Sequence, residues 1–195
     1  MKKGIFIVVE GIDGSGKGTQ SQMLCDWLNE QGFDSVLTVE PTDGEIGRVL
    51  RKGLEKGSLK PASEALLFAA DRVEHAGWIV AETDSGRIVV SDRYLQSSFA
   101  YQGAHGLDAK WIMELNRFAP VPDLLIILDI DPKLALERVN RRGGKTDYFE
   151  KLDFLSKVRE IYLNQPDGFI IDASKPVEAV QVDIQRVVGS ILKGL

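Results

Sequence analysis

Five short apolar segments rich in β-branched residues recur along the chain. They lie at 4–10, 34–39, 87–91, 123–130 and 168–172. Within each, apolar residues follow one another directly instead of alternating with polar ones, which is typical of strands that are buried on both faces. The pattern therefore predicts five interior β-strands.

Segments with helical spacing of apolar residues lie between these strands. The first is 17–31, with Gly32 marking its end. Four more are predicted at 63–82, with Ser63 as the N-cap, and at 133–141, 150–164 and 176–193. Alternating strands and helices predict an α/β domain with a parallel sheet and right-handed crossovers. Ligands of such sheets bind beyond the carboxyl ends of the strands, so the polar residues that follow each strand are the candidates for function.

The segment GIDGSGKGTQ follows the first predicted strand and leads into the first helix. It fits the phosphate-binding pattern G-x-x-x-x-G-K-[ST] at Gly11, Gly16 and Lys17, whereas Gly18 occupies the hydroxyl position and Thr19 comes one residue later. Backbone N–H groups of such a loop converge on phosphate oxygens. We expect Lys17 to reach the β- and γ-phosphates of a nucleotide, and Mg²⁺ to be held by Thr19 or through water. The alternative is a glycine-rich turn without a ligand.

Asp92 and Arg93 come directly after the third predicted strand, which places them at the carboxyl edge of the sheet. A carboxylate there can organise Mg²⁺ and its waters. An arginine there offers a fork of donors to a phosphate. The alternative for the same two residues is a surface ion pair.

Phe68 and Arg72 stand four residues apart and so share one face of a predicted helix. An aromatic ring can stack on a base, and a guanidinium can donate to a base carbonyl. By spacing alone, Phe68 is more often explained as a core residue. We expect Asp71 to support an arginine.

Four cations, Arg138, Arg141, Arg142 and Lys145, fall within eight residues. The polar stretch RRGGKTDYFE at 141–150 lies between two predicted helices and is typical of a mobile lid. Cations on a closing lid can neutralise charge on a transferring phosphoryl group. The alternative is a solvated helix end, because cations favour helix C-termini.

Several of these motifs together resemble a known family. GKGTQ is familiar from nucleoside monophosphate kinases. GIDG, LLFAADR and the run DRY with S-x-x-A-Y-Q-G resemble thymidylate kinases, and the matching motifs span residues 4 to 180. The resemblance implies a three-layer P-loop kinase fold: a five-stranded parallel sheet flanked by helices, with a short lid around 141–150. It also implies transfer of the γ-phosphoryl group of ATP to dTMP, giving dTDP, with Mg²⁺ as cofactor.

The resemblance assigns roles to residues on the donor side. ATP binding falls to the loop and one arginine: Gly11, Ile12, Asp13, Gly14, Ser15, Gly16, Lys17, Gly18, Thr19 and Arg138. Thr19 and Asp92 would hold the metal. The loop around 172–176 would lie against adenine through backbone contacts. Members of the family place a catalytic arginine either in the phosphate loop or in the lid. Because Gly14 occupies the loop position, we expect Arg141 or Arg142 to act beside Lys17, Arg93 and Asp13.

On the acceptor side, the resemblance implies that Phe68 stacks on thymine and that Arg72 reaches its O4. Arg93 would bind the acceptor phosphate, and Asp13 the 3′-hydroxyl. Tyr101 would pack under the sugar and disfavour a 2′-hydroxyl. The remaining contacts would come from Ser98 and Gln102 near the base, and from Glu150, which with Asp147 fits the family's lid.

One departure from the family concerns the segment EPTDGEIG at 40–47, because Val39 occupies the place of an expected arginine. Either one phosphate contact is missing, or Arg48 or Arg51 replaces it from the next helix. An ATP-binding protein with a degraded acceptor site is therefore one alternative. A kinase for another monophosphate or for a deoxynucleoside is a second. A regulatory GTPase is a third, but it would need an N-K-x-D motif, and the sequence has none.

Composition narrows these possibilities. A chain of 195 residues suits one domain, 1–195, and its net charge of −5 gives no support to nucleic-acid or membrane binding. Cys25 is the only cysteine, which excludes an internal disulfide and fits a reducing, cytoplasmic compartment. His75 and His105 do not stand at metal-ligand spacing. The family resemblance suggests a homodimer.

Overall fold

A five-stranded sheet forms the centre of the computed structural model, which describes residues 3–141 and 148–192. The strands follow the order β2-β3-β1-β4-β5, and every neighbouring pair is parallel. Their bounds are β1 Phe6–Glu10, β2 Ser35–Val39, β3 Ile88–Asp92, β4 Leu124–Asp129 and β5 Gly168–Asp172. All five predicted strands are confirmed.

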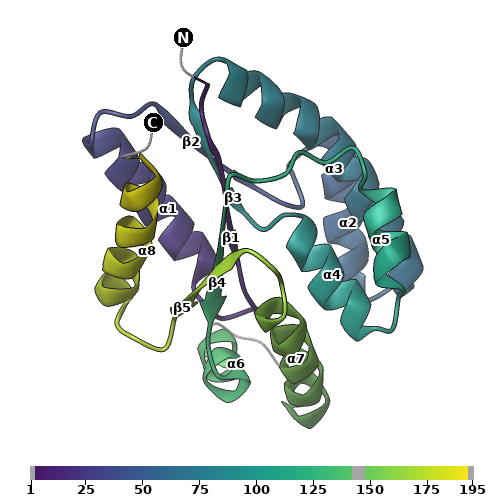
Figure 1. Cartoon of the computed structure of the whole chain (residues 1–195). Coiled ribbons are helices and arrows are strands. Elements are labelled where there is room, and N and C mark those ends of the chain that lie inside the picture. The colour runs from purple at the N-terminus through teal and green to yellow at the C-terminus, as the bar shows by residue number, and fades with distance from the viewer. Residues whose placement is uncertain (1–2, 142–147, 193–195) are drawn as a thin grey trace.

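Helices cover both faces of the sheet and produce three layers. Figure 1 shows α1 and α8 on one side, the group α2 to α5 on the other, and α6 and α7 near β4 and β5. The bounds are α1 Lys17–Glu30, α2 Glu45–Lys56, α3 Pro61–Asp84, α4 Leu95–Ala104, α5 Ala109–Leu115, α6 Pro132–Asn140, α7 Tyr148–Leu163 and α8 Val177–Leu192. This architecture confirms the predicted P-loop kinase fold. None of the helices among the described residues is long and apolar enough to cross a membrane.

The start of α3 differs from the prediction. Ser63 was expected to cap this helix, but the N-cap is Lys60 and Pro61 occupies the first turn. Proline is well suited to that position, because its fixed φ matches the helix and its missing N–H would have no partner there. The N-cap therefore lies three residues earlier than the Ser63 signal indicates.

The strands end within about two residues of one another, and this positions the functional loops. Val9 of β1 and Val39 of β2 both lie opposite Asp92 of β3. On the other side of β1, Asp129 of β4 lies opposite Asp172 of β5. The segments that follow the strands consequently meet at one edge, as expected for a parallel sheet.

The central strands should carry most of the stability of the sheet. Ile126 in β4 is fully buried, whereas Ile170 in the edge strand β5 is 53% exposed. We expect Ile126→Ala to lower the free energy of unfolding by about 3 kcal/mol, through lost burial and a cavity. The matched change Ile170→Ala should cost less than about 1 kcal/mol. Denaturant unfolding of both variants checks this, and equal losses would contradict the described position of the core.

Candidate active site

The loop between β1 and α1 has a backbone that glycines make possible. Gly11, Gly14 and Gly16 all have positive φ, at 147°, 88° and 96°. Gly16 is the N-cap of α1 and provides no side-chain cap, so the first N–H groups of the helix remain available to a ligand. The positive end of the helix dipole adds to their attraction for an anion.

Lys17 lies folded back across this loop. Its Nζ donates to the carbonyl oxygens of Gly11 at 2.8 Å and Ile12 at 3.0 Å. Burial, followed by the nearby charge of Arg93, lowers the pKa of Lys17 to about 8. Among the described residues no carboxylate bonds directly to this ammonium group, for which a phosphate would be a better partner than two carbonyls.

Beyond the loop lies a cavity of about 380 Å³ with charged walls. It is lined by Asp13, Gly14, Gly16, Lys17, Gly18, Thr19, Asp92 and Arg93. Every one of these residues was predicted from the sequence as part of the site. Four of them are charged: Asp13 and Lys17 come after β1, Asp92 is the last residue of β3, and Arg93 follows it.

The donor set in this cavity fits Mg²⁺. Burial raises the pKa of Asp92, against the opposing effect of Lys17. Its buried Oδ1 has no hydrogen-bond partner among the described residues. A Cβ at Gly18 would lie 3.2 Å from Asp92 Oδ2, so glycine here leaves room beside the carboxylate, and Thr19 lines the same cavity. No group of three acidic, histidine or cysteine ligands occurs within the described ranges. One carboxylate with a hydroxyl suits a metal that keeps several waters and takes phosphate oxygens, as Mg²⁺ does.

Arg93 joins this cavity to a second one. Its φ of 72° lies in the left-handed region, which is unfavourable for an arginine. Its guanidinium donates to Asp13 and, at 3.2 Å, to Ser97 Oγ, and it lies over the ring of Tyr101 with 5.2 Å to the centroid. Burial alone would raise the pKa of Asp13, but Arg93 and Lys17 lower it overall. Asp13 is therefore ionised at neutral pH.

The second cavity, which we call the acceptor cavity, has a volume of about 370 Å³. Phe68 projects from α3 into its wall and is half-buried rather than part of the core cluster, so the alternative that Phe68 is a core residue does not hold. Gln102 and Tyr101 come from α4. The full lining is Asp13, Pro41, Leu54, Glu64, Phe68, Arg93, Ser97, Tyr101, Gln102, His105 and Phe154.

A third cavity, the donor cavity, lies on the other side of the loop and measures about 450 Å³. Arg138 donates to the carbonyl of Ala173 at 3.1 Å and so links α6 to the loop after β5. Gln20 donates to the carbonyl of Val177 at 2.9 Å and links that loop to α1. The lining is Gly14, Ser15, Gly16, Thr19, Gln20, Arg138, Ala173, Ser174, Lys175, Pro176, Val177 and Val180. Arg138 and the loop after β5 therefore line one cavity together with the glycine loop, which is the arrangement expected for a donor-nucleotide site.

Comparison with known proteins agrees with this geometry. Residues 9–184 match the family model described as thymidylate kinase. A probable thymidylate kinase of Pyrococcus abyssi is 45% identical, over 99% of this chain and all of the relative. Another from Archaeoglobus fulgidus is 43% identical, over 96% of each chain, and one from Methanobrevibacter smithii is 41% identical, over 94% of each. The chain belongs to the thymidylate kinase family.

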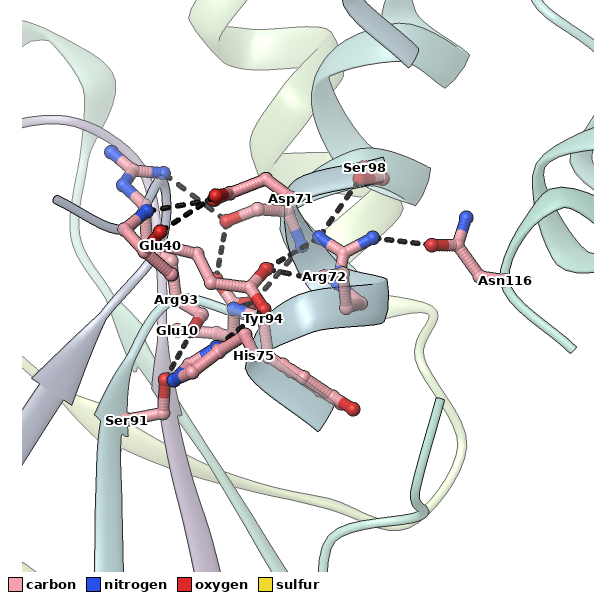
Figure 2. A network of polar contacts seen from close by, with 12 residues as sticks. Glu10, Glu40, Asp71, Arg72, His75, Ser91, Arg93, Tyr94, Ser98 and Asn116 are labelled. Carbon is pink, nitrogen blue, oxygen red and sulfur yellow. Dashed lines mark hydrogen bonds and ion pairs between the residues drawn. The ribbon is translucent and has the colours of Figure 1, made fainter. Parts of the chain in front are cut away.

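Arg72 departs from the role that the thymidylate kinase resemblance implied. It is fully buried and does not line the acceptor cavity. Its guanidinium pairs with Glu40 at 2.6 Å and reaches Ser98 Oγ at 3.3 Å and the Asn116 side chain (Figure 2). Glu40, directly after β2, provides the interior carboxylate that pairs with this buried cation.

Other residues in this network were not predicted as a group. His75 Nδ1 lies 2.9 Å from the second oxygen of Glu40. Ser98 is buried and is not among the residues that line the acceptor cavity. Asp71 accepts from the backbone N–H and hydroxyl of Thr42, at 2.7 and 2.6 Å, so the prediction that it supports an arginine is wrong. The Glu-Pro pair after β2 was the one sequence signal for this cluster.

The loop after β2 also accounts for the two arginines that were expected to replace the one missing at Val39. Arg48 donates to the carbonyl of Asp43 at 2.7 Å, and Arg51 donates to the carbonyl of Pro41. Neither lines the acceptor cavity. Both hold the loop itself, and Arg93 is the arginine that faces the acceptor cavity among the described residues.

The lid is only partly within the described residues. Arg141 is exposed at the end of α6, and Glu150 is exposed in the first turn of α7, outside the lining of the acceptor cavity. Arg142, Lys145 and Asp147 lie outside the described residues.

The space around Gly14 bears on the origin of the catalytic arginine. A Cβ at Gly14 would stand 2.3 Å from the Ala135 carbonyl oxygen. The loop therefore has no space for a catalytic arginine at this position, which agrees with a catalytic cation from the lid.

The lowered pKa of Lys17 predicts proton uptake on nucleotide binding. In the free protein most of this group is neutral at about pH 8.5, and a bound triphosphate should raise its pKa and restore the charge. ATP binding should then take up roughly three quarters of a proton at that pH and little at about pH 6.5. Calorimetry in buffers with different ionisation enthalpies measures this.

The control for this experiment is a matched pair of variants. Lys17→Met should abolish the uptake, whereas Lys110→Met, an exposed lysine of α5, should retain it. Uptake that persists in Lys17→Met would show that another group is responsible.

Proposed function

We propose that this chain transfers the γ-phosphoryl group of ATP to dTMP, giving dTDP. The observation that supports this most strongly is the continuity of the three cavities. The cavity of about 380 Å³ around Lys17 and Asp92 shares Gly14, Gly16 and Thr19 with the donor cavity, and Asp13 and Arg93 with the acceptor cavity. Two nucleotides placed in the outer cavities would thus direct their phosphates at one charged centre.

Phosphoryl transfer requires positioning and charge stabilisation more than a strong base. Lys17 and the loop N–H groups would bind the β- and γ-phosphates of ATP. Arg93 would bind the phosphate of dTMP, which is already ionised and needs no general base. Mg²⁺, held by Asp92 and Thr19, would neutralise charge on the phosphate oxygens. Arg141 or Arg142 would add the catalytic cation from the lid.

The acceptor cavity suits a deoxythymidine nucleotide. Pro41, Leu54 and Phe68 give it an apolar wall, against which a flat base with a methyl group can pack. Gln102 is buried in the lining, and its Oε1 has no partner among the described residues. The Tyr101 hydroxyl accepts from the Asp13 N–H at 3.1 Å, which fixes the ring beneath the proposed sugar position. A 2′-hydroxyl would compete with this ring for space.

A panel of acceptors tests the function. With ATP and Mg²⁺, ADP release should be fastest with dTMP, compared with dUMP, dCMP, AMP and thymidine. A preference for AMP or thymidine would contradict the proposal.

Phe68→Ala tests the base position within the same assay. Loss of stacking should raise the KM for dTMP by about tenfold or more and leave the KM for ATP nearly unchanged. Phe33→Ala, a half-exposed phenylalanine outside the described cavities, serves as the control. If Phe68→Ala raises both KM values together, the ring supports the fold and not the base.

We also propose that the protein is a cytoplasmic homodimer formed through α3. Leu66, Val73 and Val80 are 51%, 48% and 43% exposed and recur every seven residues, with Ala70 and Gly77 between them. A seven-residue repeat of apolar and small residues forms a continuous stripe that suits close packing against a second helix. Two copies of α3 would cover each other's stripe.

Val73→Glu should convert the dimer into a monomer, because it places a charge in the centre of this stripe. Sedimentation velocity measures the change. Val182→Glu, an exposed valine on α8, should leave the sedimentation coefficient unaltered. A wild-type chain that sediments as a monomer would contradict the dimer.

A further inference from the structure

One fully buried carboxylate lies next to Arg93 and has no role in the steps above. Glu10 is the last residue of β1. Its Oε1 accepts from the backbone N–H groups of Tyr94 at 2.8 Å and Ser97 at 2.9 Å. Its Oε2 accepts from the Ser97 hydroxyl at 2.7 Å and the Tyr162 hydroxyl at 2.9 Å. Figure 2 shows Glu10 close to Arg93 and Tyr94.

The two backbone contacts cap α4 from a different element. Tyr94 is the N-cap of this helix and has no side-chain cap of its own. Glu10 instead accepts from the N-cap and from the third helical residue, which is the N–H that a capping side chain normally satisfies. The start of α4 is thereby fixed to the end of β1, immediately before the phosphate-binding loop. Arg93 precedes Tyr94, and a left-handed residue of this kind persists only where its neighbours are held.

The Ser97 hydroxyl extends this restraint to the arginine side chain. It donates to Glu10 and accepts from the Arg93 guanidinium at 3.2 Å, so one hydroxyl stands between a buried carboxylate and the cation. Because the hydroxyl donates to Glu10, its oxygen accepts from Arg93. Tyr162 links the same carboxylate to α7, the helix that follows the lid.

We propose that Glu10 is a positioning residue for the acceptor phosphate, acting through Ser97 to hold the Arg93 guanidinium toward the acceptor cavity. The proposal rests on the proposed function, in which Arg93 binds that phosphate. Without this restraint, Arg93 would keep its pair with Asp13 and its place over Tyr101, but its guanidinium would turn more freely. The consequence falls on the acceptor and not on ATP, which is bound by Lys17 and the loop.

Steady-state kinetics of Glu10→Gln and Ser97→Ala test the proposal. Glutamine keeps the size of the side chain and an oxygen for the two backbone N–H groups, but it removes the charge and places an NH₂ group against the hydroxyls. Ser97→Ala keeps the two backbone contacts of the cap and removes the relay, together with the contact of the Ser97 hydroxyl to Tyr162 at 2.9 Å. Both variants should raise the KM for dTMP, by about tenfold for Glu10→Gln, while the KM for ATP stays within about twofold and Tm is retained. The double variant should be no worse than Glu10→Gln alone, as expected for residues in one relay.

Asp129→Asn is the matched control. Asp129 also ends a strand and pairs with an arginine, Arg159 of α7, at 2.6 Å, but it lines none of the three cavities. Its KM for dTMP should match the wild type. Equal changes in both KM values, or a lowered Tm with an unchanged KM for dTMP, would overturn the relay and leave Glu10 as a structural cap. If Glu10→Gln does not fold, Ser97→Ala is sufficient as a test. An unchanged KM for dTMP in this variant would overturn the proposed relay. A wild type that phosphorylates no monophosphate would instead refute the proposed function.

Discussion

The parallel, level pairing of β1 with β3 is the constraint on which the site depends. Because Val9 lies opposite Asp92, the glycine loop after β1 and the Asp92–Arg93 pair after β3 begin at the same height. The pairing of β1 with β4 and of β4 with β5 brings the loop after β5 to the same edge. One sheet edge therefore assembles three cavities without any long insertion. A shift of one residue in this register would turn Asp92 to the opposite face.

This arrangement brings several charged side chains close together in the protein interior. Lys17 and Arg93 are both largely buried, and their repulsion is one reason that the pKa of Lys17 is lowered. Asp13 and Glu10 offset the charge of Arg93 from two sides, one by an ion pair and one through Ser97. Buried charges are tolerated only when they are paired or await a ligand. Lys17 donates only to two carbonyl oxygens among the described residues, so a phosphate is the ligand that would give this cation an anionic partner.

The apolar runs in the sequence predicted the five strands well. Each strand is short and consists mostly of apolar residues, so its own composition indicates that it is buried. The helices α4 and α5 were not predicted, and α2 was expected only as a helix of unstated bounds that carries Arg48 and Arg51. For α4 the cap comes from Glu10, which lies 84 residues before Tyr94, and no local signal marks the helix start. α5 has only seven residues, too few for a helical period to stand out. Arg72 illustrates the same limit in the site: its position relative to Phe68 predicted a shared face, but its burial depends on Glu40, 32 residues earlier. The residues of the glycine loop and Arg93 were predictable because motif and strand end coincide there.

The central claim is that ATP and dTMP approach one charged centre from opposite sides of the glycine loop. A crystal structure with adenosine and thymidine joined by a chain of phosphates tests it most directly. We expect thymine to lie against Phe68, adenine to lie against the loop at 173–177, and the phosphates to lie between Lys17 and Arg93. Thymine in the donor cavity, or a phosphate chain that does not contact Lys17 and Arg93, would contradict it.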